Sequence, residues 1–177
     1  MMDTKRILER AKNIKLLACD VDGVLTRGEI ILLNSGEEVK IWNVKDGMGY
    51  NLLSRMSYKV KTAWITGRKS VQVENRASEM KIDYLVQNCV NKKQAIETIA
   101  QKEALDLSQI AYIGDDVMDI SVLKSVGLSS CPADACAVAK EAAGFISSFN
   151  GGDAVVREMI DFIIKASGEC QKILRRF

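Results

Sequence analysis

The chain has 177 residues, of which 47% are hydrophobic and 27% are charged, and its formal net charge is +2. This length and composition suit a globular domain with a core of its own, so residues 1–177 are expected to form a single domain. The charge balance gives no reason to expect a nucleic-acid partner, and the lack of any apolar run of about 18 residues argues against a membrane span.

The spacing of the cysteines and the lack of histidine bear on metal binding and on the cellular compartment. The five cysteines form no Cys-x-x-Cys pair and the chain has no histidine, which argues against a zinc site. Free thiols and the lack of a targeting segment predict a cytoplasmic protein.

Hydrophobic patterning along the chain predicts strands and helices in alternation. Helices are expected near residues 3–13, 46–56, 70–81, 92–103, 119–126, 135–142 and 154–166, and strands near 14–19, 60–65, 84–86, 110–113, 128–130 and 144–146. Asp46 and Asn91 are candidate helix caps. This alternation is typical of an α/β fold with a doubly wound, Rossmann-like parallel sheet.

A β-hairpin is predicted at about residues 27–43, between the first strand and the next helix. Two apolar runs flank Asn34-Ser35-Gly36, which is a turn sequence. The first arm, Ile30–Leu33, is apolar on both faces. An isolated subunit would expose this surface, so the pattern predicts burial against another subunit.

Two acidic residues follow the first predicted strand. The apolar run Ile14–Cys19 ends in Asp20, and Asp22 follows two residues later. A short apolar run without alternation is typical of a strand buried on both faces, and open α/β sheets bind ligands at the carboxyl ends of their strands. Residues i and i+2 of an extended segment point to the same side, so both carboxylates can reach one reacting group. Gly23 permits a tight turn with exposed backbone N–H groups. An ordinary Asp-x-Asp-Gly turn is the alternative.

Polar groups also follow the next three predicted strands. Thr66-Gly67 follows the second strand, Lys92 begins the helix after the third, and Gly-Asp-Asp-x-x-Asp at residues 114–119 follows the fourth. Separately, these are readily interpreted as a turn, a solvated helix face and a helix cap. Since the carboxyl ends of parallel strands share one sheet edge, all of them can meet in one crevice.

The residue types in this set fit phosphoryl chemistry. Carboxylates brought together repel one another and raise each other's pKa, and a hard divalent cation removes that cost. Oxygen ligands without histidine or thiolate point to Mg²⁺. A metal with Lys92 and the Thr66 hydroxyl can neutralise a phosphoryl group, and a carboxylate beside the metal can act as the nucleophile.

Four motifs in this order resemble those of the haloacid dehalogenase-like phosphatases. They are Asp-x-Asp-Gly-Val-Leu-Thr from Asp20, Ile-Thr-Gly-Arg ending at Arg68, Lys92, and Gly-Asp-Asp-x-x-Asp ending at Asp119. A closer similarity is to the phosphatases of 3-deoxy-D-manno-octulosonate 8-phosphate (KDO 8-phosphate). It depends on the motifs at residues 46–49, 66–68, 76–79, 132–135 and 151–158. Cys136 departs from the family pattern, which has histidine there.

The resemblance implies Mg²⁺-dependent hydrolysis of a sugar-acid phosphate through an aspartyl-phosphate, as a step in lipopolysaccharide precursor synthesis. Asp20 would be the nucleophile, and Asp22 the general acid and then the base. The other implied roles are metal binding by Asp20, the Asp22 carbonyl and Asp115, support from Asp116 and Asp119, and phosphate binding by Gly23, Thr66, Gly67 and Lys92. Arg68 and Arg76 are candidates to bind the substrate carboxylate, and helix-face ion pairs are their alternative.

The spacing of the motifs also bears on assembly. Residues 23–46 have room only for the hairpin, and residues 67–92 only for a helix and a strand, so the fold is predicted to be capless. A capless site would be open to water, and a ring of subunits would close it, in agreement with the homotetramers of the resembling family. The basic C-terminal tail, about residues 168–177, is expected to extend to a neighbouring subunit's site, with a frayed terminus as the alternative.

Three other functions fit parts of the pattern. A receiver-type signalling domain shares the acids, the Thr and the Lys around Mg²⁺, but its phosphoacceptor lies on a middle strand and no second acidic cluster follows the Thr and Lys. A non-catalytic assembly domain of the same fold would not need every catalytic group. A phosphatase of a nine-carbon keto-sugar acid 9-phosphate would carry an acidic residue in place of Arg68, so Arg68 favours the eight-carbon acid.

Overall fold

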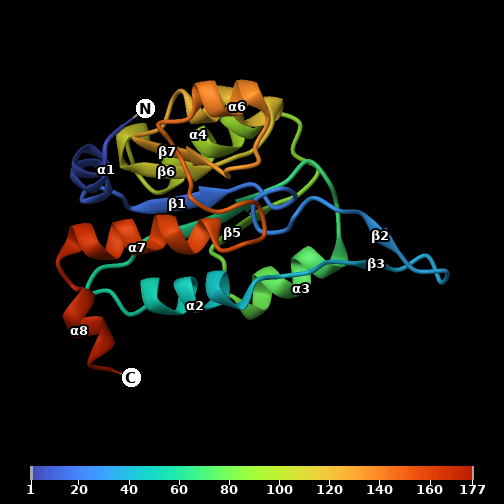
Figure 1. Cartoon of the computed structure of the whole chain (residues 1–177), viewed down its shortest axis with the longest axis horizontal. Coiled ribbons are helices and arrows are strands. Elements are labelled where there is room, and N and C mark those ends of the chain that lie inside the picture. The colour runs from blue at the N-terminus through green and yellow to red at the C-terminus, as the bar shows by residue number, and fades with distance from the viewer. Residues whose placement is uncertain (1, 177) are drawn as a thin grey trace.

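A parallel six-stranded sheet forms the centre of the computed structural model, which describes residues 2–176 (Figure 1). The strands are β1 (Leu16–Cys19), β4 (Lys61–Ile65), β5 (Tyr84–Val86), β6 (Ile110–Ile113), β7 (Leu128–Cys131) and β8 (Phe145–Ile146). They lie in the order β5-β4-β1-β6-β7-β8, and each neighbouring pair is parallel. By position along the chain this is the order 3-2-1-4-5-6, which reverses between β1 and β6. Open α/β sheets bind ligands at such a reversal.

Helices cover both faces of the sheet and complete the predicted doubly wound fold. One face packs against α1 (Thr4–Ala11), α2 (Val44–Leu53), α3 (Val71–Glu79), α7 (Val155–Ser167) and α8 (Cys170–Leu174), and the other against α4 (Lys92–Lys102), α5 (Ile120–Leu123) and α6 (Ala137–Ala142). Two short 3-10 helices, η1 (Leu107–Gln109) and η2 (Val117–Asp119), precede β6 and α5.

The central strand explains the continuous apolar run in the sequence. Leu17 and Cys19 of β1 point into the core on the α2 and α7 side, and Leu16 and Ala18 point into the core on the α4 side. All four side chains are fully buried. A strand covered on both faces favours apolar side chains at every position, and in β1 the first charged side chain comes at Asp20, where the strand ends.

The predicted hairpin is confirmed. Its strands, β2 (Ile31–Leu32) and β3 (Glu38–Val39), are antiparallel and project from the carboxyl end of the sheet (Figure 1). The apolar side chains of Ile30, Leu32 and Ile41 are 60%, 64% and 67% exposed. The hairpin therefore carries apolar surface that this chain does not cover itself.

The prediction that Asp46 caps α2 is wrong. Asn43 is the cap, because its side chain accepts the Lys45 N–H at 2.9 Å. Asp46 lies in the first turn and points inward, where its Oδ1 accepts the Arg157 N–H at 2.8 Å. It therefore satisfies the start of α7 instead of its own helix.

The C-terminal tail also differs from the expectation of a free, extended segment. It forms α8, and Ile173 is buried in the core on the α7 side. Both carboxylate oxygens of Glu169 accept hydrogen bonds from Ser57, and Arg176 donates to the Arg55 carbonyl at 3.2 Å. Ile173 and these polar contacts therefore dock the tail on its own chain, at the opposite end of the molecule from the hairpin (Figure 1). The final residue of the tail prediction, Phe177, lies outside the described residues.

Across residues 2–176, no helix combines the length and the apolar composition that a membrane span requires.

Candidate active site

Asp20 lies directly after β1, at the carboxyl end of this central strand. Its Oδ1 accepts the backbone N–H of Val21 at 2.7 Å, and its Oδ2 lies 2.6 Å from Lys92 Nζ. Burial raises the pKa of Asp20 to about 6, although Lys92 opposes the shift and nearby Asp119 adds to it. The carboxylate is therefore held in one orientation but is incompletely neutralised.

Lys92 is a buried cation between two acids. It is the first residue of α4, and its Nζ lies 2.8 Å from Asp119 Oδ1 as well as close to Asp20. Burial opposes the charge of a lysine, but the two carboxylates outweigh burial and raise its pKa. The alternative of a solvated helix-face lysine is excluded, because only 2% of the side chain is exposed.

Asp119 is fully buried and accepts hydrogen bonds from four donors. Lys92 Nζ and the Tyr112 hydroxyl donate to Oδ1 at 2.8 and 2.6 Å. The backbone N–H groups of Asp115 and Asp116 donate to Oδ2 at 3.1 and 3.2 Å. Since both oxygens are occupied, Asp119 is suited to fixing its neighbours and has little capacity left for a metal ion.

Asp115 has the opposite character. Its Oδ1 is buried and has no hydrogen-bond partner in the described part of the chain, and a Cβ at Gly23 would lie 2.1 Å from its Oδ2. Gly23 also has φ +87°, so two observations require glycine there. Burial, with the charges of Asp20 and Asp119, raises the pKa of Asp115 to about 7. Within residues 2–176, Asp115 is thus a carboxylate that forms no ion pair of its own, and the charge of Lys92 opposes the rise of its pKa only in part.

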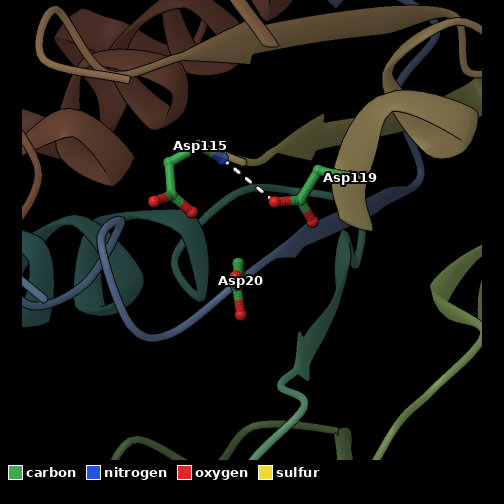
Figure 2. Close-up of side chains that lie close together, drawn as sticks. All are labelled: Asp20, Asp115 and Asp119. Atoms are coloured by element: carbon green, nitrogen blue, oxygen red, sulfur yellow. Dashed lines mark hydrogen bonds between the residues drawn. The ribbon is translucent and has the colours of Figure 1, made fainter. Parts of the chain in front are cut away.

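These features fit a divalent cation. One oxygen from each of Asp20, Asp115 and Asp119 lies within 4.8 Å of the others, as the three carboxylates in Figure 2 indicate. Of the three, Asp115 has the unpartnered oxygen. Carboxylate oxygens without nitrogen or sulfur donors match the preference of Mg²⁺.

The loop after β4 lies beside Asp20, because β4 pairs in parallel with β1 and Trp64 is opposite Cys19. Thr66 is buried, and its Oγ1 accepts the Arg68 N–H at 3.3 Å. Thr66 and Gly67 therefore lie at the same sheet edge as the acidic cluster, as their places in the sequence predicted.

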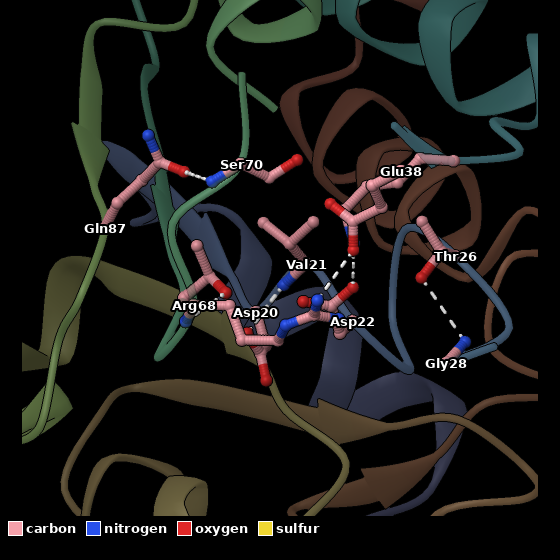
Figure 3. A network of polar contacts seen from close by, with 11 residues as sticks. Asp20, Val21, Asp22, Thr26, Gly28, Glu38, Arg68, Ser70 and Gln87 are labelled. Atoms are coloured by element: carbon pink, nitrogen blue, oxygen red, sulfur yellow. Dashed lines mark hydrogen bonds and ion pairs between the residues drawn. The ribbon is translucent and has the colours of Figure 1, made fainter. Parts of the chain in front are cut away.

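Asp22 contacts the hairpin. Its Oδ1 forms an ion pair with Nζ of Lys40, and only 2% of the Lys40 side chain is exposed. Glu38 Oε1 lies 3.6 Å from the same Nζ and accepts a hydrogen bond from Arg68 Nη2 at 2.7 Å. Figure 3 shows Asp22, Glu38 and Arg68 gathered beside Asp20. The hairpin therefore supplies polar groups to the site of its own chain.

Two candidate residues have other contacts. Arg76 Nη1 pairs with Glu79 at 2.7 Å on α3, which is the helix-face alternative, and a Cβ at Gly47 would lie 3.0 Å from its Nη2. Asp116 is exposed, and its side chain accepts the Val117 N–H at 2.7 Å. Asp116 and Asp119 form a capping box, in which the side chain of each residue accepts the backbone N–H of the other.

The motifs at residues 132–135 and 151–158 meet behind the Asp20 loop. Asp134 Oδ1 accepts the Gly151 N–H at 2.8 Å, and a Cβ at Gly151 would lie 2.0 Å from the carbonyl oxygen of Gly23. These motifs therefore support the loop that carries the acids.

Three residues at the site were not predicted from the sequence: Tyr112, Lys40 and Glu38. Tyr112 could have been predicted, because a tyrosine within an apolar strand is buried and its hydroxyl needs a hydrogen-bond partner. Lys40 and Glu38 could not have been predicted in this way, because their contacts join segments that only the folded hairpin brings together.

Comparison with known proteins agrees with this geometry. The profile of the haloacid dehalogenase-like hydrolases matches residues 68–159, just over half of the chain. The KDO 8-phosphate phosphatase KdsC of Escherichia coli K12 is 39% identical over 92% of this chain and 86% of its own. The chain belongs to the haloacid dehalogenase-like hydrolase family.

Solved structures of haloacid dehalogenase-like hydrolases superimpose on the whole fold. The KDO 8-phosphate phosphatase of Moraxella catarrhalis, in complex with magnesium, phosphate and KDO, matches with a TM-score of 0.94 at 34% identity over 99% of each chain. The Yersinia pestis phosphatase matches with a TM-score of 0.89 at 38% identity, over 94% of this chain and 89% of its own. A receiver domain has the different strand order 2-1-3-4-5, so that alternative is excluded.

Proposed function

We propose that this chain is a Mg²⁺-dependent phosphatase that converts KDO 8-phosphate to KDO and phosphate. The observation that best supports this proposal is the cluster of Asp20, Lys92 and the incompletely neutralised Asp115 at the reversal of the strand order. The substrate follows from the KDO 8-phosphate phosphatases, which resemble the chain over nearly its full length. The product would enter lipopolysaccharide synthesis.

The chemistry starts at Asp20, whose carboxylate attacks phosphorus. An Asp20–phosphorus bond forms as the bond from phosphorus to the sugar oxygen breaks, and Asp22 gives its proton to that leaving oxygen. Asp22 then takes a proton from water, and the hydroxide attacks phosphorus and releases Asp20. One group, in two protonation states, thus serves both steps.

The remaining residues bind the phosphoryl group and the metal ion or fix the groups that do so. Lys92, the Thr66 hydroxyl and the backbone of Gly67 and Gly23 bind the phosphoryl oxygens. Asp20, Asp115 and the Asp22 carbonyl hold Mg²⁺, which when bound offsets the charge of the phosphoryl group and the carboxylates. Asp119 fixes Lys92 and the backbone of Asp115 and Asp116 by three of its four hydrogen bonds, and the fourth comes from the Tyr112 hydroxyl.

Substrate selection is assigned to the arginines. Arg68 is near the site and pairs with Glu38 through Nη2, and the remaining N–H donors of its guanidinium can bind a substrate carboxylate beside Glu38. Arg76 is assigned the same role, although here it pairs with Glu79.

The proposal includes assembly and location. We infer one domain over residues 1–177 and a cytoplasmic homotetramer in which hairpins cover neighbouring sites. The exposed apolar hairpin and five cysteines that form no disulfide support this. The proposal that the tail enters a neighbouring site is weakened by the packing of α8 on its own chain.

A phosphate-release screen tests the function. KDO 8-phosphate, a nine-carbon keto-sugar acid 9-phosphate and ordinary sugar phosphates are compared with Mg²⁺ and with a chelator. The largest kcat/KM is expected for KDO 8-phosphate with Mg²⁺. A larger kcat/KM for the nine-carbon acid 9-phosphate would identify that compound as the substrate. No phosphate release from any compound would favour the non-catalytic assembly domain.

A further inference from the structure

The second arm of the hairpin places a buried ammonium group in the site. Lys40 lies just after β3, in an element whose other side chains are largely exposed, yet only 2% of its own side chain is exposed. A lysine seldom gives up its hydration without charged partners. Its partners therefore indicate what it does.

Lys40 has two carboxylate partners. Its Nζ pairs with Asp22 Oδ1 and lies 3.6 Å from Glu38 Oε1. Glu38 is fixed in turn by Arg68, whose Nη2 lies 2.7 Å from the same Oε1. Three segments thus converge on Asp22: its own loop, the hairpin and the loop after β4 (Figure 3).

The contact is selective within the Asp22 carboxyl group. Lys40 occupies Oδ1, and no protein hydrogen bond is present at Oδ2 among residues 2–176. The 22% exposure of the Asp22 side chain leaves room for another molecule to approach. A carboxyl group that is held at one oxygen and open at the other is positioned to exchange a proton at the open oxygen.

We propose that Lys40 is a positioning residue for Asp22, so that the hairpin takes part in proton transfer within its own chain. Lys40 fixes the Asp22 carboxyl group while the proton passes from Oδ2 to the leaving oxygen, as the bond from phosphorus to that oxygen breaks. Glu38 and Arg68 hold Lys40 in place. This role rests on the proposed phosphatase function and assigns the hairpin a task besides subunit contact.

The test compares two substrates of nearly equal size, phenyl phosphate and 4-nitrophenyl phosphate. Nitrophenolate leaves easily without a proton, whereas phenolate benefits more from the acid. Lys40→Met keeps the length of the side chain and removes its charge. We compare kcat/KM, which reports only the steps through transfer of the phosphoryl group to Asp20 and leaves out the hydrolysis that both substrates share. We expect kcat/KM for phenyl phosphate to fall about tenfold or more, and kcat/KM for 4-nitrophenyl phosphate to fall less than about threefold.

A double-mutant cycle with Asp22→Asn makes the result decisive. If Lys40 acts through Asp22, the double variant should be no slower than Asp22→Asn alone. Lys45→Met, at an exposed lysine close by in sequence, serves as the control and should leave both rates unchanged. Lys40→Arg should restore part of the phenyl phosphate rate.

Two outcomes would overturn the proposal. One is an equal loss on both substrates, which would mean that Lys40 only maintains the hairpin. The other is an additive loss in the Asp22→Asn background. Both outcomes reject the positioning role. Size-exclusion chromatography and circular dichroism of Lys40→Met would then show whether the loss of activity comes from a change in assembly or fold. The proposed function fails separately, if wild-type protein releases no phosphate from either compound.

Discussion

At the scale of a single residue, Asp20 has to carry a charge in a place that disfavours one. The proposed mechanism needs its charge for nucleophilic attack, yet Asp20 is 8% exposed and close to Asp119. Catalytic groups are often held in environments that cost stability.

Substituting Asp20→Asn is therefore expected to abolish turnover while preserving the fold. An amide is a poor nucleophile, so phosphate release from 4-nitrophenyl phosphate should fall below detection. The melting temperature in the absence of metal should stay the same or rise, because a buried charge is removed. Near wild-type turnover in the folded variant would contradict the role of Asp20.

The carboxyls also predict how stability depends on pH. The pKa values in the folded chain are about 6 for Asp20 and about 7 for Asp115, and an unfolded aspartate has a pKa of about 4. Between these values the folded state binds more protons than the unfolded state. The metal-free protein should therefore lose stability as pH rises from about 4 to about 7.

Magnesium should reverse this trend, since it binds the charged carboxylates. The stabilisation by Mg²⁺ should be small near pH 5 and large near pH 8. Thermal melts with chelator and with Mg²⁺ at several pH values measure both effects, and Asp115→Asn should reduce each of them. A stabilisation by Mg²⁺ that does not vary with pH would contradict the assignment.

Asp46 joins two elements, α2 and α7. Its Oδ1 accepts the Arg157 N–H, while its Oδ2 is buried and has no hydrogen-bond partner among the residues that the structure describes. Burial raises its pKa to about 6, although hydrogen bonds from the start of α7 oppose the shift. Asp46→Ala would leave the start of α7 unsatisfied and should lower the free energy of unfolding by about 1–2 kcal/mol.

Urea denaturation measures this effect, with Asp161→Ala as the control because Asp161 forms an exposed ion pair on α7. The control should cost less than about 0.5 kcal/mol. Asp46→Asn keeps an acceptor oxygen and should be milder than Asp46→Ala. Equal effects of Asp46→Ala and the control would show that Asp46 does not support α7.

The same element shows how far sequence reasoning reaches. Strand ends and helix starts follow from local patterns, so Asp20, Thr66, Lys92 and the acids at 114–119 could be placed along one sheet edge. Asp46 was misjudged because a good capping residue in the sequence does not show whether it points to its own helix. Contacts between distant segments, such as Lys40 with Asp22, are fixed by hairpin geometry that no local pattern encodes.

At the scale of the whole molecule, residues 2–176 include no cap domain, because only the hairpin separates β1 from α2, and only α3 and β5 separate β4 from α4. In the proposed tetramer, the cover of the site comes from neighbouring subunits. The hairpin projects beyond the sheet edge and exposes Ile30, Leu32 and Ile41. Burying each such side chain is worth about 1.5–3 kcal/mol, and a symmetric assembly repeats the gain in every subunit. The tail, in contrast, docks on its own chain at the far end.

The double variant Ile30→Glu and Leu32→Glu should therefore convert the proposed tetramer to monomers. Light scattering coupled to size-exclusion chromatography measures the mass, and Glu37→Gln near the hairpin turn is a control that should stay tetrameric. In the monomer, kcat/KM for KDO 8-phosphate should fall more than that for 4-nitrophenyl phosphate, because the larger substrate would contact the neighbouring subunit. A wild-type protein that is monomeric, or a glutamate variant that remains tetrameric, would show that the hairpin does not form the subunit interface. The exposed apolar surface would then need a different partner.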